Sequence, residues 1–536
     1  MGERPWHAYL RPHPSRETPA LLRLLVATIS GGALALSYAG FYLSIYSWIC
    51  VGILLVVLFE ARPWIAFGCG FLHGFCFVLT SVPWIAEVLA VHGGLSRAGG
   101  WGVLLLIAAI WSIAMGLTTW AIHRISLRSV TLACATAPFF WIAFEFFRAK
   151  LPEISFPWNL LGYPAAYNLG LLQLTTITGI YGLSFVVVAF NALLAWADVA
   201  TSPPPRRRVA ILGGAATLIL IVMLVGPRLV PLHESNHWAR AVQLNFPEAQ
   251  EYPPDWFATH TADLDEARRL SLEPTPRHPD LLVWPEAPAP FSFQDPQFAK
   301  LASALAIRFQ HPFVAGVVDW KRETVSDKTG SHTSFAPFNS ALLIDAQGQR
   351  VFSYDKVHLV PFGEYEPFPL IHRVVSNVSG EVGGFRKGTT YSVGRLPGGY
   401  AFSIFICYEA IYPGEIRHFA ANGAQLFVNI SNDGWFGHSA AAEQHLRMAR
   451  VRAVENRRWL IRTTNNGITV SIDPYGRIFR RIPSDIRGAI DLPYDFRTDK
   501  TIYSRFGDWF PWLCVIVSVI LLVICWKPKK KEEQLS

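Results

Sequence analysis

Long apolar runs separated by short polar connections dominate the first 227 residues of the chain. Runs of about 17 to 23 mostly apolar residues have the length that a helix needs to cross the hydrocarbon core of a bilayer. They occur near 21–38, 42–59, 64–86, 102–122, 130–147, 175–197, 209–227 and 509–526. We therefore predict an α-helical membrane bundle of about eight spans. The sixth is the least regular, because Gly179 and Gly182 interrupt it.

The segment between the seventh and eighth runs has a different pattern, in which short strand-like runs alternate with longer amphipathic stretches. Strands are predicted at 281–284, 313–318, 340–345, 350–354, 401–406, 426–430 and 468–472, and helices at 254–270, 296–309 and 439–458. Turn sequences at 345–348 and 473–476 predict hairpins. The pattern indicates a layered α/β domain inserted before the last span. We divide the chain into a membrane domain (1–227), a polar domain (228–508) and a last span with a basic tail (509–536).

The composition agrees with a membrane protein, since a mean hydropathy of +0.28 with 16% charged residues is too apolar for an ordinary soluble enzyme. If all the spans exist, most Lys and Arg of the short connections fall on one side, which is expected to be cytoplasmic. These residues are Arg4, Arg11, Arg16, Arg62, Arg124, Arg128, Arg206, Arg207, Arg208, Lys527, Lys529, Lys530 and Lys531. Both termini are thus predicted to be cytoplasmic and residues 228–508 to face the opposite side. Because the net charge of +8 partly reflects this topology, we expect no nucleic-acid partner.

One cysteine differs in its surroundings from the other six. Those six lie in apolar runs long enough to be spans: Cys50, Cys69, Cys76, Cys134, Cys514 and Cys525. Cys407 instead ends the predicted strand 401–406 in the polar domain, where a polar turn follows. If that domain lies outside the cytoplasm, a solitary thiol indicates reactivity more than disulfide formation. A thiol nucleophile acts as the thiolate, so it needs a base and benefits from a nearby cation.

Two further motifs end predicted strands and supply those groups. Trp284-Pro285-Glu286 places a carboxylate just beyond the strand 281–284. Tyr354-Asp355-Lys356 places an ammonium after the strand 350–354, and Glu364 follows eight residues later. Each motif is weak alone, but the order Glu, Lys, Cys resembles the nitrilase superfamily. The blocks 429–437 and 462–467 further resemble its membrane-bound branch, the apolipoprotein N-acyltransferases of bacterial inner membranes.

The resemblance implies a fold and roles for the residues. The polar domain would be a nitrilase-like αββα sandwich on the periplasmic side of the inner membrane. Glu286 would be the base, Lys356 the oxyanion donor and Cys407 the nucleophile of a thioester mechanism. Glu364 would orient Lys356 or share the proton relay. Tyr408 and Glu409 would shape the turn and pocket, with the Tyr408 N–H as a second oxyanion donor.

The resemblance also implies the substrates. The acyl donor would be a membrane glycerophospholipid, and the acceptor the α-amino group of the diacylglyceryl-cysteine of an apolipoprotein. No cofactor is expected. Trp158, Phe368 and Trp435 are candidates for lipid access or a lid, although an interfacial aromatic belt explains Trp158 equally well. His438 and His445 show no paired carboxylate at ligand spacing, so we expect no metal site.

Two other functions fit parts of the pattern. A membrane-tethered amidase or nitrilase that hydrolyses a carbon–nitrogen bond would use the same triad, but a soluble substrate needs at most one anchor. A transporter or receptor would carry ionisable residues in several spans, and these are scarce here. The acyltransferase is therefore the preferred interpretation.

Overall fold

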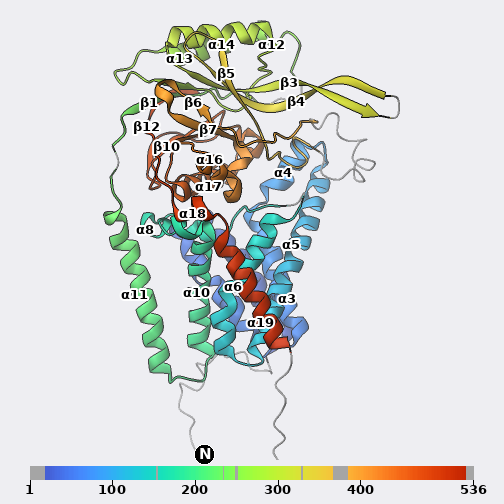
Figure 1. Ribbon diagram of the computed structural model, residues 1–536. Coiled ribbons are helices and arrows are strands. Elements are labelled where there is room, and N and C mark those ends of the chain that lie inside the picture. The colour runs from blue at the N-terminus through green and yellow to red at the C-terminus, as the bar shows by residue number, and fades with distance from the viewer. Residues whose placement is uncertain are drawn as a thin grey trace, which may run out of the picture.

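A helical bundle lies beneath a two-sheet α/β domain (Figure 1) in the computed structural model, which describes residues 18–152, 155–232, 234–247, 252–327, 330–365 and 384–526. The apolar runs form these helices: α1 (Ala20–Leu36), η2 (Tyr42–Trp48), α2 (Cys50–Leu58), α3 (Pro63–Ser81), α4 (Trp84–Val91), α5 (Arg97–Ser126), α6 (Val130–Lys150), α7 (Gly162–Ala165), α8 (Leu169–Leu172), α9 (Thr175–Thr178), α10 (Ile180–Val199), α11 (Pro205–Leu229) and α19 (Trp509–Trp526).

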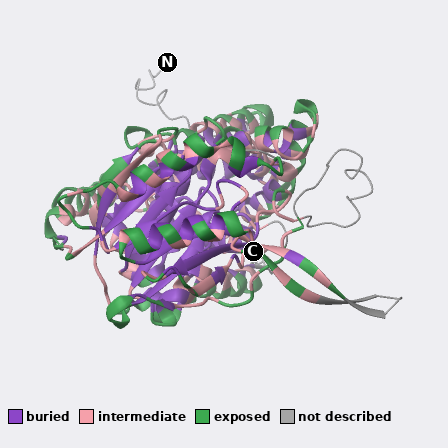
Figure 2. Ribbon diagram, turned by 90° about the horizontal axis from the view of Figure 1, so that it is seen from above, coloured by how far each residue is buried: buried purple, intermediate pink, exposed green. Residues whose placement is uncertain are grey.

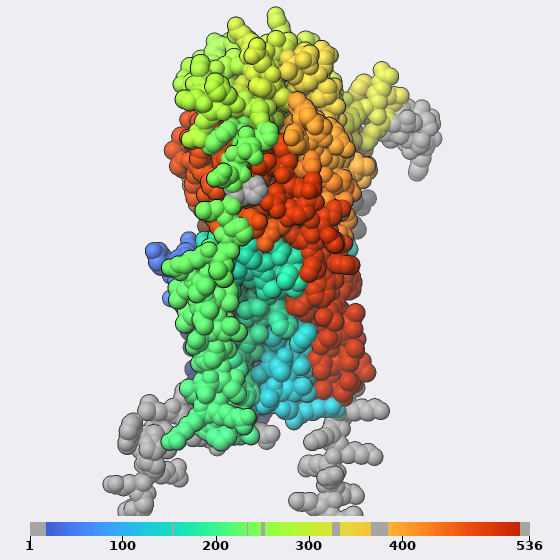
Figure 3. All heavy atoms as spheres, turned by 60° about the vertical axis from the view of Figure 1, so that its left-hand side comes forward, coloured from blue at the N-terminus to red at the C-terminus, as the bar shows by residue number. Residues whose placement is uncertain are grey.

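Five of the described helices are long and apolar enough to cross a membrane, namely α3, α5, α6, α10 and α11. Shorter apolar helices at Ala20–Leu36, Tyr42–Leu58 and Trp509–Cys525 coincide with the three other predicted runs. The predicted sixth run is broken, as its glycines indicated: α9 ends before Gly179, whose φ of 65° lies in the left-handed region, and α10 starts after it. No residue in the most apolar 18-residue stretch of α11 is buried. Figure 3 shows this helix in green along the flank of the bundle.

The polar segment folds into twelve described strands with covering helices. Its elements are β1 (His237–Gln243), α12 (Trp256–Thr259), α13 (Thr261–Leu272), β2 (Leu281–Val283), α14 (Pro296–Phe309), β3 (Phe313–Asp327), β4 (Gly330–Ile344), β5 (Arg350–Asp355), β6 (Gly394–Arg395), η3 (Pro397–Gly399), β7 (Ala401–Ile406), η4 (Cys407–Ile411), α16 (Pro413–Ala421), β8 (Leu426–Ser431), η5 (Asp433–Phe436), α17 (Ala441–Asn456), β9 (Trp459–Thr464), β10 (Thr469–Ile472), β11 (Ile478–Ile482), β12 (Gly488–Tyr494) and α18 (Ile502–Phe506).

Two six-stranded sheets stack face to face. Their orders are β12-β1-β2-β3-β4-β5 and β11-β10-β9-β8-β7-β6. Parallel pairing joins β1, β2 and β3 in the first sheet and β7, β8 and β9 in the second, and the edge strands are antiparallel. Buried residues such as Val283, Val314 and Ile404 form the core between the sheets. The strands in the middle of the domain are accordingly buried in the view from above, whereas the projecting arm is intermediate and exposed (Figure 2).

Helices cover the outer face of each sheet and complete the αββα sandwich. Helices α12, α13 and α14 lie on the first sheet, away from the bundle, whereas α16 and α17 lie between the second sheet and the bundle (Figure 1). Apolar residues of α17, including Ala441, Met448 and Val451, share one buried cluster with the membrane helices. The second sheet therefore reaches the bundle through α17.

All seven predicted strands and the three predicted helices are present, but β3 extends to Asp327 and β4 begins at Gly330, well beyond the predicted ranges 313–318 and 340–345. The helix predicted at 254–270 is divided into α12 and α13. The sequence pattern missed β1, β6, β9, β11 and β12. β9 follows α17 almost directly, with Arg457 in the left-handed region (φ 51°) as the helix end, so no glycine or proline marks the boundary.

We expect Gly31→Ala to destabilise the bundle, because α1 and α3 are in close backbone contact at this glycine. A Cβ on Gly31 would lie 2.1 Å from the carbonyl oxygen of His73, so the helices would have to separate. Overpacking of this kind costs about 1–3 kcal/mol. Gly213→Ala in α11 is the matched control, since its Cβ would meet no atom within 4 Å. Thermal unfolding in detergent should show a lower midpoint for the first variant alone, and equal midpoints would contradict the packing of α1 on α3.

Candidate active site

Cys407 lies at a strained turn at the end of β7. Its φ of 47° places a non-glycine residue in the left-handed region, where such residues are uncommon and cost free energy. The residue is buried and is the first of η4. The first N–H groups of such a helical turn have no acceptor within the helix.

The carboxylate of Glu409 holds this turn in place. Its Oε2 accepts a hydrogen bond from the N–H of Ile406 at 2.7 Å. Its Oε1 accepts from the Tyr354 hydroxyl at 2.6 Å and from the N–H of Val357 at 2.7 Å. Burial raises the pKa of Glu409 to about 7. One side chain thus ties the Cys407 turn to the end of β5, where Lys356 follows.

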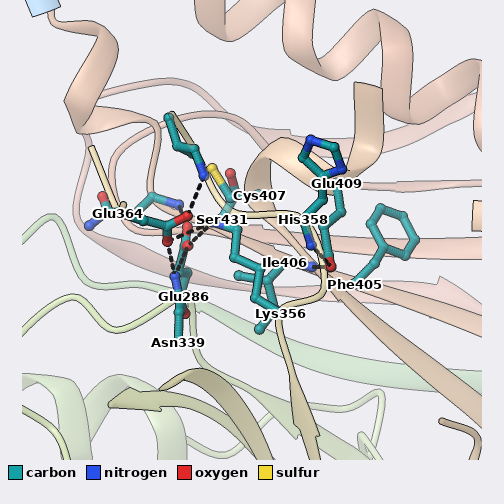
Figure 4. Close-up of polar contacts among 12 residues, drawn as sticks. Glu286, Asn339, Lys356, His358, Glu364, Phe405, Ile406, Cys407, Glu409 and Ser431 are labelled. Atoms are coloured by element: carbon teal, nitrogen blue, oxygen red, sulfur yellow. Dashed lines mark hydrogen bonds and ion pairs between the residues drawn. The ribbon is translucent and has the colours of Figure 1, made fainter. Parts of the chain in front are cut away.

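Lys356 lies between the two glutamates that the sequence motifs singled out. Its Nζ is 3.0 Å from Oε1 of Glu286 and 2.9 Å from Oε1 of Glu364, and its side chain is 1% exposed (Figure 4). Burial alone would lower the pKa of this lysine, but the two carboxylates outweigh burial and hold the pKa above its ordinary value. The site therefore contains a fixed buried cation.

Asn339 and a backbone N–H position these glutamates. The Asn339 amide donates to Glu286 at 2.7 Å and to Glu364 at 2.5 Å (Figure 4). The second oxygen of Glu286 accepts from the N–H of Asn432, which follows β8 in the other sheet, at 2.8 Å. Sequence reasoning missed Asn339, although an amide in the otherwise apolar end of β4 was a usable signal.

The surroundings of Cys407 favour the protonated form of its thiol. Burial is the main cause that raises the pKa of this thiol above its ordinary value, and the carboxylate of Glu286 is the second. The charge of Lys356 lowers the pKa but does not outweigh them. A buried thiol of this kind becomes a nucleophile only when a base takes its proton. Glu286 is the carboxylate that interacts with both the thiol and the lysine.

A second polar network lies on the other side of Cys407. Arg462 donates to Oδ2 of Asp433 at 2.7 Å, and Nδ1 of His445 is 3.0 Å from Oδ1 of the same carboxylate. Burial alone would raise the pKa of Asp433, but Arg462 and His445 hold it below its ordinary range. The sequence analysis was wrong to treat His445 as lacking a carboxylate, because the fold brings Asp433 to it from 12 residues earlier.

The donor atoms of Cys407, Asp433 and His445 all lie within 4.8 Å of one another, which is a spacing that a metal ion could use. Each nitrogen of His445 is already in a hydrogen bond, and the guanidinium of Arg462 binds the carboxylate. A buried guanidinium at this position would repel a metal cation. The arrangement is better described as an ion pair that supports the Cys407 turn.

The remaining predicted residues lie farther from the thiol or outside the described residues. Tyr408 is buried beside Cys407, with its ring centroid 5.4 Å from that of Tyr412. Trp158 is fully buried where the bundle meets α17 and donates to Gln444 at 2.7 Å. Trp435 contacts His92 after α4, at 4.5 Å between ring centroids. Phe368 falls outside the described residues, so the proposed lipid-access roles stay predictions.

A cavity of about 230 Å³ lies where the bundle meets the α/β domain. Its lining comes from both parts and includes Lys150, His358, Tyr365, Tyr412, Glu415 and Asp508. His358 and Tyr365 are close in the chain to Lys356 and Glu364, but Glu286, Lys356 and Cys407 are not among the residues that line this cavity.

Two family models match the chain. Residues 239–493 match the carbon-nitrogen hydrolase family, and residues 30–193 match the apolipoprotein N-acyltransferase N-terminal domain. An apolipoprotein N-acyltransferase of Geobacter metallireducens is 32% identical over 516 residues, which cover 95% of this chain and 96% of that one. The chain belongs to the apolipoprotein N-acyltransferase family. It is therefore a membrane-bound acyltransferase.

Other similar proteins span different shares of the chain. The apolipoprotein N-acyltransferase of Allorhizobium ampelinum is 31% identical over 490 residues, with 87% of this chain and 89% of that one covered. Among solved structures, Nit3 of Saccharomyces cerevisiae, a member of the nitrilase superfamily, is 19% identical with a TM-score of 0.36. That match covers 49% of this chain and 90% of Nit3.

The pH dependence of Cys407 alkylation tests the electrostatics of the site. The iodoacetamide rate should keep rising above pH 9, whereas an ordinary thiol with a pKa of about 8.5 levels off there. The negative charge of Glu286 disfavours the thiolate, so Glu286→Gln should move the curve to lower pH. Glu443→Gln, at an exposed carboxylate paired with Arg481, should leave the curve unchanged. Mass spectrometry of the Cys407 peptide measures the rate, and an unshifted Glu286→Gln curve would contradict this account.

Proposed function

We propose that this chain transfers a fatty acyl chain from a membrane glycerophospholipid to the α-amino group of the diacylglyceryl-cysteine of apolipoproteins, through a thioester on Cys407. The observation that carries the proposal is the place of the thiol. The thiol interacts with the charges of the buried Glu286–Lys356 pair, and the next residue, Tyr408, belongs to the buried cluster of the membrane helices. A lipid ester therefore reaches the nucleophile without leaving the membrane surface.

In the first step, Glu286 accepts the Cys407 proton and the sulfur attacks the ester carbonyl carbon. The electron pair of the carbonyl moves to its oxygen, where the Lys356 ammonium and the Tyr408 N–H stabilise the charge. The intermediate collapses as the bond from the carbon to the ester oxygen breaks. Glu286 returns the proton to the departing lysophospholipid, and an acyl thioester remains.

In the second step, the free amine of the acceptor attacks the thioester carbonyl carbon. An α-amino group has an ordinary pKa of about 7.7–8.0, so a useful fraction is unprotonated at neutral pH. As the carbon–sulfur bond breaks, Glu286 takes a proton from the nitrogen and passes it to the Cys407 thiolate. The products are an amide and the resting thiol, and no cofactor takes part.

The site arrangement supports periplasmic catalysis by a protein of the bacterial inner membrane. Residues 228–508 would form the catalytic domain on the periplasmic face, with both termini in the cytoplasm. The excess of Lys and Arg in alternate short connections supports this orientation. Glu364 then orients Lys356, and Glu409 shapes the turn that carries the nucleophile.

We expect a fatty acyl adduct on the purified protein, located at Cys407. Cys407→Ala should abolish the adduct, and Glu286→Gln or Lys356→Ala should slow acylation by at least about a hundredfold, because a base or an oxyanion donor is lost. Cys69→Ala, at a buried cysteine of α3, is the matched control and should keep the adduct. Intact-mass measurement detects it. Near-normal acylation in a triad variant would remove that residue from the mechanism.

Transfer and hydrolysis differ in what happens without the acceptor. With phospholipid alone, the enzyme should release about one lysophospholipid per active site and then nearly stop, because a thioester intermediate accumulates. Varying phospholipid and diacylglyceryl-peptide should give parallel double-reciprocal lines. Continuous release of free fatty acid at a comparable rate without the amine would show that water is the acceptor, as in a membrane-bound hydrolase.

A further inference from the structure

The peptide unit between Cys407 and Tyr408 carries two groups that matter for the reaction. A trans peptide is planar, and its C=O and N–H point in opposite directions. A contact that fixes the Cys407 carbonyl therefore also fixes the direction of the Tyr408 N–H. A φ of 47° is a strained conformation for a cysteine. Contacts from other parts of the chain must therefore stabilise the orientation of this peptide.

His445 makes that contact from α17. Its Nε2 is 2.9 Å from the carbonyl oxygen of Cys407. A carbonyl oxygen only accepts hydrogen bonds, so Nε2 must carry the proton. Glu409 holds the preceding residue, Ile406, through its N–H at 2.7 Å. The strained turn is thus held on both sides of the nucleophile, by a carboxylate and by an imidazole.

The other ring nitrogen, Nδ1 of His445, is held by Asp433 and Arg462. It is 3.0 Å from Oδ1 of Asp433 and 3.1 Å from the NH2 group of Arg462, which also donates to Oδ2 of Asp433 at 2.7 Å. These contacts hold the ring from the Nδ1 side, while Nε2 donates to the Cys407 carbonyl. Burial, and next the charge of Arg462, lower the pKa of His445.

Aromatic side chains fix the plane of the imidazole. The ring of Trp158, from the loop after α6, lies 5.7 Å away with a tilt of 31° between the rings. Phe436 meets the imidazole edge-on at 5.9 Å. His445 is completely buried, so the ring has no room to rotate out of its hydrogen bonds. The membrane domain therefore helps to orient a residue that touches the nucleophile's own peptide.

We propose that His445 is the positioning residue of the oxyanion site: it holds the Cys407 carbonyl so that the Tyr408 N–H faces the oxygen on which charge develops. The inference rests on the proposed acyl transfer and deepens it. His445 does not contact the substrate or take the thiol proton. Replacing the His445 side chain should slow the steps that form an oxyanion. Reactions of the Cys407 thiol that form no oxyanion should keep their rate.

Two reactions at Cys407 separate these effects in the full-length enzyme. Acylation by phospholipid passes through a tetrahedral oxyanion, whereas alkylation by iodoacetamide is a displacement at a saturated carbon and needs only the thiolate. His445→Asn lacks a donor at the Nε2 position, because the amide nitrogen of Asn reaches only the place of Nδ1. The longer His445→Gln places its amide nitrogen near the lost Nε2–H. His438→Asn is the matched control, since the side chain of His438 is 89% exposed.

We expect His445→Asn to lower the acylation rate by about a hundredfold, as for a lost oxyanion donor, with the phospholipid KM little changed. Alkylation should stay within about threefold of wild type, because the thiolate is still formed. His445→Gln should recover most of the acylation, and His438→Asn should match wild type in both reactions. Should the Asn variant fail to fold in a thermal melt, His445→Met, which has similar volume and no donor, takes its place with the same expectation.

Other outcomes would overturn the inference. Equal losses of acylation and alkylation would mean that His445 acts on the thiolate or on the fold. Unchanged acylation in the donor-free variants, or a Gln variant as slow as the Asn variant with an intact melt, would mean that the contact with Cys407 has no role in the oxyanion site. Absence of an acyl adduct on the wild-type enzyme would instead refute the proposed function, so the two failures are distinguishable.

Discussion

The ammonium group of Lys356 is buried away from water, with 1% of its side chain exposed. An unpaired buried charge costs several kcal/mol, so the fold must bring carboxylates to it. Glu286 comes from the end of β2 and Glu364 from the segment after β5, and Asn339 of β4 bridges the two. The other oxygen of Glu286 binds the N–H of Asn432 at the end of β8. The contacts that neutralise this one lysine thus connect segments that follow strands of both sheets.

The membrane bundle is part of this arrangement and not only an anchor. The loop after α6 is fixed by Glu145, which accepts from the N–H of Leu161 at 2.7 Å. Trp158 of this loop donates to Gln444 of α17 and packs on His445. Because α17 lies between the second sheet and the bundle, the same helix meets the lipid-embedded part and the Cys407 turn. In the proposed reaction, a substrate held at the membrane surface would meet a turn that the bundle itself helps to stabilise.

Sequence reasoning succeeded where the signal was local. Glu286, Lys356 and Cys407 each follow a predicted strand, which is a local signal, although Glu286 and Lys356 follow strands of one sheet and Cys407 follows a strand of the other. Asn339, Asp433 and Arg462 lacked such a signal, because their partners come from other elements: Asn339 of β4 contacts carboxylates that follow β2 and β5, and Arg462 of β9 contacts Asp433 after β8. The strands β1 and β12 were missed for a related reason: they pair with each other across most of the domain, and a pairing of such separation leaves no local turn signal. Membrane runs, by contrast, depend on composition and length alone.

The geometry also explains how a thiol with a raised pKa can serve as a nucleophile in a buried site. In the proposed mechanism Glu286 takes the Cys407 proton, so one negative charge leaves an oxygen and appears on the sulfur, and the sum of formal charges does not change. During attack the same charge moves on to the substrate oxygen. Lys356 stays in place throughout and is already paired before the reaction starts. No charge is created or brought in from water, and the cation needs little reorganisation as the negative charge moves around it.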